Sequence, residues 1–316
     1  MAVLVLTRPL AITPPPPETL PIGRAALLLA ERNLTLCFGG SQGALRAIPG
    51  GWAPWTGQAC ALYDRFPSWT WPLDYDRARA GLERLPMGNP LTFRDLCRDK
   101  LAFQRGCPVK MPDVLNDPGD FKAAVRDWGG AFLKPRCGGL GRGVRFVRPG
   151  DALPTEVEGA VPGQLEPAIL QRAVSPPEGL AALSLRVLMQ REEQGWVQAG
   201  VVARSSQTDP VANVDRGARA RPAADVCDRA TLRQQRSICE AVTNWIRDPL
   251  VVEVGLDLVV DPSGRPHLIE ANSRPGGRLL ALGPQHEQAH LEACLRPLLY
   301  LCQTVSGEGV LVGGQT

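Results

Sequence analysis

Three oxygen-bearing side chains late in the chain have the types and spacing needed to hold a divalent cation. Asp257 lies in a run of β-branched and apolar residues, Val254 to Val260, while Glu270 and Asn272 lie two residues apart in the next apolar run. The segment between the runs, Asp261-Pro-Ser-Gly264, is typical of a turn, so the pattern predicts an antiparallel hairpin. Residues opposite each other on such strands lie side by side, and residues two apart share a face.

The chemistry expected of this trio is cation binding. Two carboxylates that close repel one another unless a proton or a cation lies between them. Together with a carboxamide oxygen they form a hard-ligand set, which suits Mg²⁺ held partly by nucleotide phosphates. The alternative is an ordinary hairpin whose acids lie on the solvated face.

Lysine is rare in this chain, and its positions are informative. Only four of the 35 basic residues are lysines: Lys100, Lys110, Lys122 and Lys134. Because the chain otherwise uses arginine, a retained lysine indicates a need for a compact point charge, with chance retention as the alternative for Lys110 and Lys122. The apolar spacing predicts that Lys100 lies on a helix that starts near Leu91, and that Lys134 ends a short strand.

A glycine-rich segment follows Lys134. Gly138, Gly139, Gly141 and Gly143 fall within six residues and precede a Val/Phe strand. Backbone amides without a Cβ in the way approach phosphate oxygens closely, so the segment predicts a phosphate-binding hairpin tip. A plain tight turn is the alternative. No Gly-Lys-Ser/Thr follows, which excludes a Walker A loop.

Length and composition place these motifs in a globular enzyme. At 316 residues, two or three subdomains are expected. We predict an N-terminal α/β domain at 1–90, a nucleotide-binding subdomain at 91–175 and a subdomain with the metal site at 176–316. A net charge of +3 does not favour nucleic acid, and we expect neither a membrane span nor a signal peptide. Nine scattered cysteines without C-x-x-C spacing predict reduced thiols in the cytoplasm.

The order of these motifs is distinctive. The chain carries, in this order, Lys100, Lys134-Pro, the glycine hairpin, an apolar strand at 170–171 and Asp257. Glu270-Ala-Asn272 and then Pro275-Gly276 follow. Residues 90–300 resemble the ATP-grasp superfamily of carboxylate–amine ligases, and the ending with its upstream Asp257 is the specific part. The layout is similar to bacterial glutathione synthetase, ribosomal-protein glutamate ligases and spore-coat-associated ATP-grasp proteins. The resemblance implies an α/β fold in which an ATP-grasp unit of α+β subdomains follows a small α/β domain.

The resemblance also implies roles for particular residues. It implies that Asp257, Glu270 and Asn272 bind Mg²⁺, with Mn²⁺ as an alternative, and that Arg186, Arg204 and Arg219 neutralise charge during acylphosphate formation and amide-bond (peptide-bond) formation. ATP would be bound by Lys100, Lys134, Gly138, Gly139, Gly141, Gln171, Arg172, Ala173, Val174 and Asn213.

Two positions depart from the pattern of the relatives. Ser184 stands two residues before Arg186, where relatives often have an acid, and Gln171 stands where many have Glu. Hydrogen bonding to the ribose would then come from elsewhere in the chain.

The substrates are an anionic carboxylate, such as an amino acid or a peptide, and an amine. We expect Arg204 and Arg219 to clamp the anionic substrate. We expect neither nucleic acid nor a membrane as a partner, and the protein could form a homo-oligomer. One alternative is a non-catalytic ATP-binding or structural ATP-grasp protein. The other is a zinc metallopeptidase, because His286-Glu287-Gln-Ala-His290 matches H-E-x-x-H and would place both imidazoles on one helical face.

Overall fold

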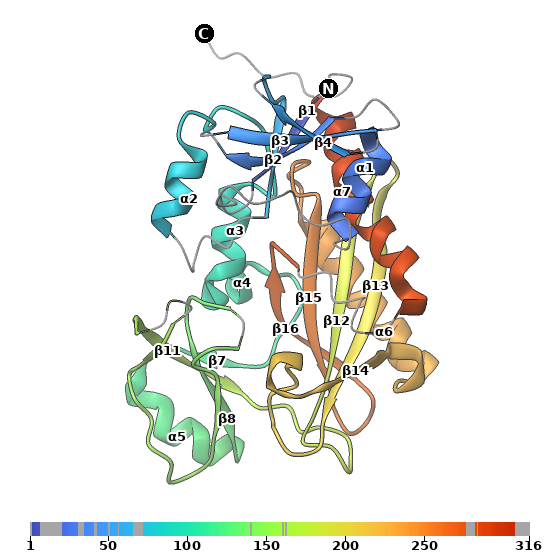
Figure 1. The fold of residues 1–316 in the computed structure, drawn as a ribbon. Helices are drawn as coiled ribbons and strands as arrows, with labels where there is room; N and C mark the ends of the chain where they lie inside the picture. Colours follow the sequence, from blue (N-terminus) through green and yellow to red (C-terminus); the bar gives the residue numbers. More distant parts are fainter. Residues whose placement is uncertain are drawn as a thin grey trace.

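The protein is a mixed α/β structure with three β-sheets (Figure 1). The computed structural model describes residues 2–6, 21–30, 35–40, 43–49, 51–55, 57–65, 72–139, 141–159, 161, 163–275, 282 and 284–306. Gly276 and the final residues from 307 lie outside the described residues. No helix in the described part is both long and apolar enough to cross a membrane.

The first sheet, at the top of Figure 1, has the strand order β4-β3-β2-β1-β5-β6. Strand β1 is parallel to β2 and β5, and β5 is parallel to β6, whereas β2, β3 and β4 form an antiparallel meander. Its elements are β1 (Ala2–Leu6), α1 (Pro21–Ala30), β2 (Thr35–Gly40), β3 (Gly43–Ile48), β4 (Gly51–Trp55), β5 (Ala61–Asp64), α2 (Pro72–Arg79) and β6 (Met87–Gly88).

The second sheet is small and antiparallel, with β10-β11-β8-β9 in order and β7 paired to β11. Helix α5 covers it and supplies Phe121 and Val125 to its core. Asp117 caps this helix by accepting a hydrogen bond from the Gly119 amide, and Gly129 ends it in the left-handed conformation. The elements are α3 (Leu91–Arg98), α4 (Lys100–Gly106), β7 (Val114–Leu115), α5 (Pro118–Trp128), β8 (Ala131–Pro135), β9 (Arg145–Val147), β10 (Glu156–Glu158) and β11 (Leu165–Arg172).

The third sheet is antiparallel with the order β14-β13-β12-β15-β16, and its long strands form the right-hand wall in Figure 1. Helix α6 packs against it through buried residues such as Cys239 and Val242. The elements are β12 (Ala182–Glu192), β13 (Gly195–Ser206), η1 (Val214–Arg216), β14 (Arg219–Pro222), η2 (Ala223–Asp225), α6 (Arg229–Trp245), β15 (Glu253–Val260), β16 (Pro266–Asn272), η4 (Pro284–His286) and α7 (Glu287–Val305).

Three helices tie the sheets together. Phe93 of α3 and Phe103 of α4 belong to the core of the third sheet, and Leu298 and Leu301 of α7 belong to the core of the first. The division of the chain at residues 90 and 175 stays a prediction, and α3, α4 and α7 pack across it.

Several local expectations need correction. The helix expected from Leu91 is two helices, because the Asp99 carboxylate accepts hydrogen bonds from the amides of Leu101 and Ala102 and starts a new helix there. The sequence from Leu73 to Leu85 predicts a helix, but α2 ends at Arg79. The polar residues at 205–224 predict a loop, but this segment contains strand β14, whose backbone pairs with β13.

Candidate active site

A cavity of about 1220 Å³ opens between the second and third sheets and extends to α2 and α3. Of the described residues that line it, twelve are Lys or Arg and three are Asp or Glu, so it suits anionic ligands. Fifteen of the sixteen predicted site residues line this cavity: Lys100, Lys134, Gly138, Gly139, Gly141, Gln171, Arg172, Ala173, Val174, Arg186, Arg204, Asn213, Asp257, Glu270 and Asn272. The exception is Arg219.

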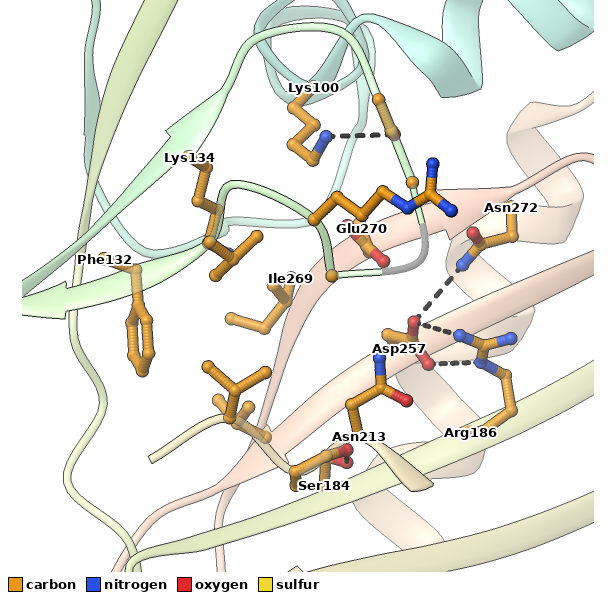
Figure 2. Close-up of a pocket in the computed structure, with 18 of the residues that line it drawn as sticks. Lys100, Phe132, Lys134, Ser184, Arg186, Asn213, Asp257, Ile269, Glu270 and Asn272 are labelled. Atoms are coloured by element: carbon orange, nitrogen blue, oxygen red, sulfur yellow. Dashed lines mark hydrogen bonds and ion pairs between the residues drawn. The ribbon is translucent and has the colours of Figure 1, made fainter. Parts of the chain in front are cut away.

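The acidic wall of the cavity is the β15–β16 hairpin. Asp257 and Glu270 are direct cross-strand partners, and the pairing shifts by one residue immediately after Asp257. The Asn272 amide donates a hydrogen bond to Asp257 Oδ2 over 3.2 Å. Figure 2 shows these three side chains converging from neighbouring strands. Asp257, Glu270 and Asn272 therefore converge as predicted.

Asp257 is also the centre of a buried ion-pair cluster. Its carboxylate accepts hydrogen bonds from Arg186 Nε and from Arg186 Nη2, the second over 2.5 Å, and from Arg204 Nη2 over 2.9 Å. Burial alone would raise the pKa of the Asp257 carboxyl, but the two guanidinium groups outweigh burial and hold it well below its ordinary value. Arg204 Nε donates to Ser184 Oγ over 3.1 Å, which gives this serine a role in orienting the arginine.

The basic wall is formed by two lysines from the second sheet and α4 (Figure 2). Lys100 is the first residue of α4, and its ammonium donates to the carbonyl oxygens of Pro135 and Gly138 at 3.2 and 3.1 Å. Lys134 is buried and donates to Gln171 Oε1 over 2.5 Å. Burial lowers the pKa of Lys134 from 10.5 to about 8, against the opposing effect of Glu270.

The glycine-rich segment lies between β8 and β9 and reaches the third-sheet side of the cavity. At Gly141, which has a φ of +70°, an added Cβ would lie 2.9 Å from Asn213 Nδ2. Glycine avoids backbone strain and crowding at the point where this segment meets Asn213. The contact brings together two predicted nucleotide-binding elements that lie about 70 residues apart in sequence.

Comparison with known families now identifies this architecture. A model of the YheC/D-like ATP-grasp family matches residues 112–303. The chain belongs to this ATP-grasp family. The match includes Lys134, the glycine-rich segment and the trio Asp257, Glu270 and Asn272, while Lys100 and the first sheet precede it.

Solved structures share the ATP-grasp fold at low sequence identity. D-alanyl-alanine synthetase A from Vibrio cholerae O1 biovar eltor is 14% identical, with a TM-score of 0.57 over 96% of this chain and 97% of that one. A D-cycloserine synthetase is 18% identical, with a TM-score of 0.53 over 94% and 99%. The macrocyclase MdnC from Microcystis aeruginosa, bound with its precursor peptide MdnA, is 12% identical, with a TM-score of 0.52 over 94% and 99%. Comparison with curated proteins gives no significant match.

Strand β11 of this ATP-grasp fold leads into four of the residues expected to bind ATP. Gln171 and Arg172 are its last residues, and Ala173 and Val174 follow the strand along the cavity wall. Phe132 also lines this wall but was not predicted from the sequence. It lies two residues before Lys134 on β8, so the alternation of the strand could have indicated it.

Arg219, which we expected to clamp the substrate, does not line the cavity. Arg219 pairs with Ser205, whereas Arg204 pairs with Ala220. Because adjacent residues on a strand point to opposite faces, Arg219 is exposed on the face away from Arg204 and is absent from the cavity wall. Arg204 lines the cavity and is ion-paired with Asp257.

The H-E-x-x-H sequence does not form the arrangement that a zinc peptidase needs. His286 ends a 3-10 turn, and α7 begins only at Glu287, so the two histidines do not share an α-helical face. Glu287 pairs with Arg24, and His290 is buried. Among the described residues, no group of three or more His, Cys, Asp or Glu side chains could hold a metal ion.

Sequence reasoning also missed an arginine-rich end of the cavity. Arg79, Arg94 and Arg274 lie there around the ring of Tyr75. The residues come from α2, α3 and the segment after β16, so no spacing in the sequence connects them. In a chain that uses arginine so often, composition could not single them out.

Proposed function

We propose that this protein is an ATP- and Mg²⁺-dependent ligase that joins a carboxylate to an amine through an acylphosphate, with an amino acid or a peptide as substrate. The observation that carries the proposal is the opposition of two walls in one cavity. Asp257, Glu270 and Asn272 lie on one wall, and Lys100 and Lys134 lie on the other.

The oxygen trio fits Mg²⁺ by the chemistry of its donors. Two carboxylates on adjacent strands and one carboxamide oxygen are hard ligands, which Mg²⁺ and Mn²⁺ both accept. Arg186 and Arg204 already neutralise much of the charge of Asp257, so Glu270 would carry a large share of the cation's binding. When bound, the ion would neutralise charge on the nucleotide phosphates.

The basic wall is suited to the nucleotide. Lys100 and Lys134 would pair with phosphate oxygens, and the glycine segment Gly138–Gly141 would contribute backbone amides. Gln171, Arg172, Ala173 and Val174 would border the adenine, with Phe132 as an apolar surface beneath it. Asn213 would close the phosphate end, because it already contacts the position of Gly141.

The reaction follows from this charge arrangement. A carboxylate oxygen attacks the γ-phosphorus and ADP leaves, which gives an acylphosphate. An amine nitrogen then attacks the acyl carbon, phosphate leaves with the bonding electrons, and the nitrogen loses a proton. Two anions approach each other in the first step, so the lysines of the basic wall would stabilise the developing charge. Arg186 and Arg204 would hold Asp257 in place and add positive charge nearby.

The names of the similar structures support the type of reaction. Two of them are synthetases of small amino-acid derivatives, and the third is a macrocyclase bound with a precursor peptide. Bond formation on amino acids or peptides is therefore represented among proteins with this fold.

An acylphosphate trap tests the proposal without knowledge of the natural amine. Purified protein would receive Mg²⁺, ATP, hydroxylamine as a general nucleophile, and a panel of amino acids, N-acyl amino acids and short peptides. We expect ADP release coupled to formation of one hydroxamate, detected by mass spectrometry. Absence of coupled ADP and hydroxamate across the panel, despite ATP binding, would refute the ligase and leave a nucleotide-binding protein.

A substitution tests the metal-binding role of Glu270. Glu270→Gln removes a ligand charge and should lower kcat by about a hundredfold to a thousandfold, the usual effect of losing one preorganised electrostatic group. Glu240→Gln, on the exposed side of α6, is the matched control and should retain full activity. Equal activity of the two variants would remove Glu270 from the mechanism.

A further inference from the structure

One end of the cavity gathers three guanidinium groups around a single aromatic ring. The guanidinium carbons of Arg94, Arg274 and Arg79 lie 5.4, 5.6 and 5.7 Å from the centroid of the Tyr75 ring. Tyr75 is buried, and it packs with Ala78 of α2. The ring stabilises nearby cations, but three cations held this close also repel one another.

Of the three described acids nearest these arginines, only Asp64 is buried. Asp64 is buried and accepts hydrogen bonds from the Tyr75 hydroxyl, over 2.7 Å, and from Arg274. Arg94 donates over 3.1 Å to its neighbour Asp95, whose side chain is 60% exposed and therefore neutralises it only weakly. Asp76 lines this end as well, but it is exposed.

Arg79 carries the clearest sign of a missing partner. Its Nε is buried and makes no hydrogen bond within the described residues. A buried N–H of a charged group without an acceptor is costly, and an anion in the cavity would offset this cost once the Arg79 side chain turns to bring the nitrogen towards it. Arg79 lies at the end of α2, where the helix dipole favours a cation. Among the described residues, however, no acceptor forms a hydrogen bond with its Nε.

The cluster lies within the length of a small molecule from the proposed metal site. Arg274 is only two residues after Asn272, which corresponds to about 7 Å along an extended chain. Both residues line the same cavity. A substrate whose reacting carboxylate lies near Asn272 could therefore place a second group against the arginines.

We propose that Arg79 and Arg94, with Arg274 and Tyr75, bind a second anionic group on the carboxylate substrate, either a carboxylate or a phosphate. This inference rests on the proposed ligase function and narrows its substrate to small molecules with at least two anionic groups. It also moves substrate recognition from Arg204 and Arg219 to the end of the cavity formed by α2 and α3. Planar guanidinium forks match the oxygens of either anion.

Direct binding tests the proposal independently of turnover. Isothermal titration calorimetry on protein saturated with Mg²⁺ and ADP would compare L-glutamate with L-glutamine, and O-phospho-L-serine with L-serine. Each pair differs by one anionic group, and the two pairs separate carboxylate from phosphate. We expect wild type to bind the anionic member of at least one pair tenfold or more tightly than the neutral member.

Charge-removing variants locate the binding group. Arg79→Gln and Arg94→Gln should each weaken binding of the anionic ligand about tenfold to a hundredfold, the range expected for a charge-assisted hydrogen bond. Binding of the neutral ligand and of ADP should change by less than about twofold. The matched control is Arg77→Gln, which lies on α2 but is exposed and outside the cavity wall. If a Gln variant does not fold, Arg94→Lys retains the charge and should keep the preference for the anionic ligand.

Three outcomes would overturn the inference: no binding of either anionic ligand, equal binding within both pairs, or equal losses in Arg77→Gln and Arg79→Gln. The two proposals fail in different ways. Anion binding that depends on Arg79 without any hydroxamate formation refutes the ligase alone. Hydroxamate formation from monocarboxylates without Arg79 dependence refutes the anion site alone.

Discussion

Asp257→Asn should destabilise the protein far more than an ordinary surface substitution. Asp257 is 7% exposed, and its two oxygens receive four hydrogen bonds, three from Arg186 and Arg204 and one from Asn272. An asparagine keeps one acceptor oxygen, but its amide group would face donors. If the oxygen keeps the position of Oδ1, one bond from Arg186 and the bond from Asn272 are lost, and the two guanidinium groups lose their counter-charge. Removing one partner of a buried ion pair costs about 3–5 kcal/mol, so we expect a loss of that size in the free energy of unfolding.

Urea denaturation at pH 7 and low magnesium measures this change in stability. A double-mutant cycle with Arg186→Met distinguishes a buried ion pair from general disruption of the strand. If the pair is the cause, the double variant should lose at least about 1 kcal/mol less than the sum of the single variants. A loss below about 1 kcal/mol for Asp257→Asn, or additive single effects, would refute the reasoning.

Three further predictions concern other parts of the structure. Lys134→Met should raise the Kd of ATP about tenfold to a hundredfold in equilibrium titration, because it removes a charge-assisted bond to phosphate while keeping the side-chain volume. Gly143→Ala should lower the free energy of unfolding by at least about 2 kcal/mol in urea, because its φ is +64° and an added Cβ would lie 2.0 Å from the Glu158 carbonyl oxygen. Burial would raise the pKa of Asp261, but hydrogen bonds from His267 and the turn lower it to about 2, so its contribution to stability is present above pH 4 and is lost as the pH falls towards 2. With partial solvent screening this contribution is about 1 kcal/mol, and Asp261→Asn should remove that part of the acid dependence in denaturation measured from pH 5 to pH 2.

Each of these predictions has a control or a contradicting result. Lys110→Met changes an exposed lysine outside the cavity wall and should leave the Kd of ATP unchanged. Gly150→Ala also sits at positive φ but meets no atom within 4 Å, so it should lose only about 1 kcal/mol of conformational strain. Equal losses at Gly143 and Gly150 would contradict the clash. An unchanged acid slope in Asp261→Asn would show that this carboxylate does not contribute.

Much of the candidate site could be predicted from the sequence, because its signals are local. The alternation of a strand, a turn sequence and a second alternating strand were enough to place Glu270 opposite Asp257 and Asn272 on the same face. The retained lysines and the glycine run were likewise visible within short windows. For such residues, spacing along one or two strands determines geometry.

Contacts between distant segments depended on tertiary structure. The bond between Arg186 and Asp257 requires β12 to pair with β15 across about 70 residues, and no local pattern specifies that partner. The register of β14 on β13 alone decides that Arg219 faces away from Arg204, since a shift of one residue would reverse its face.

The arginine-rich end of the cavity could not be predicted from the sequence either. Its members come from α2, α3 and the segment after β16, and only the packing of these elements brings Arg79, Arg94 and Arg274 to one tyrosine ring. Sequence alone thus determined the hairpin and the positions of Asp257, Glu270 and Asn272 on it, because period and turn chemistry act within a few residues. Which arginines meet which acids was decided by the tertiary structure, because charge pairing depends on distances that the order of residues does not contain.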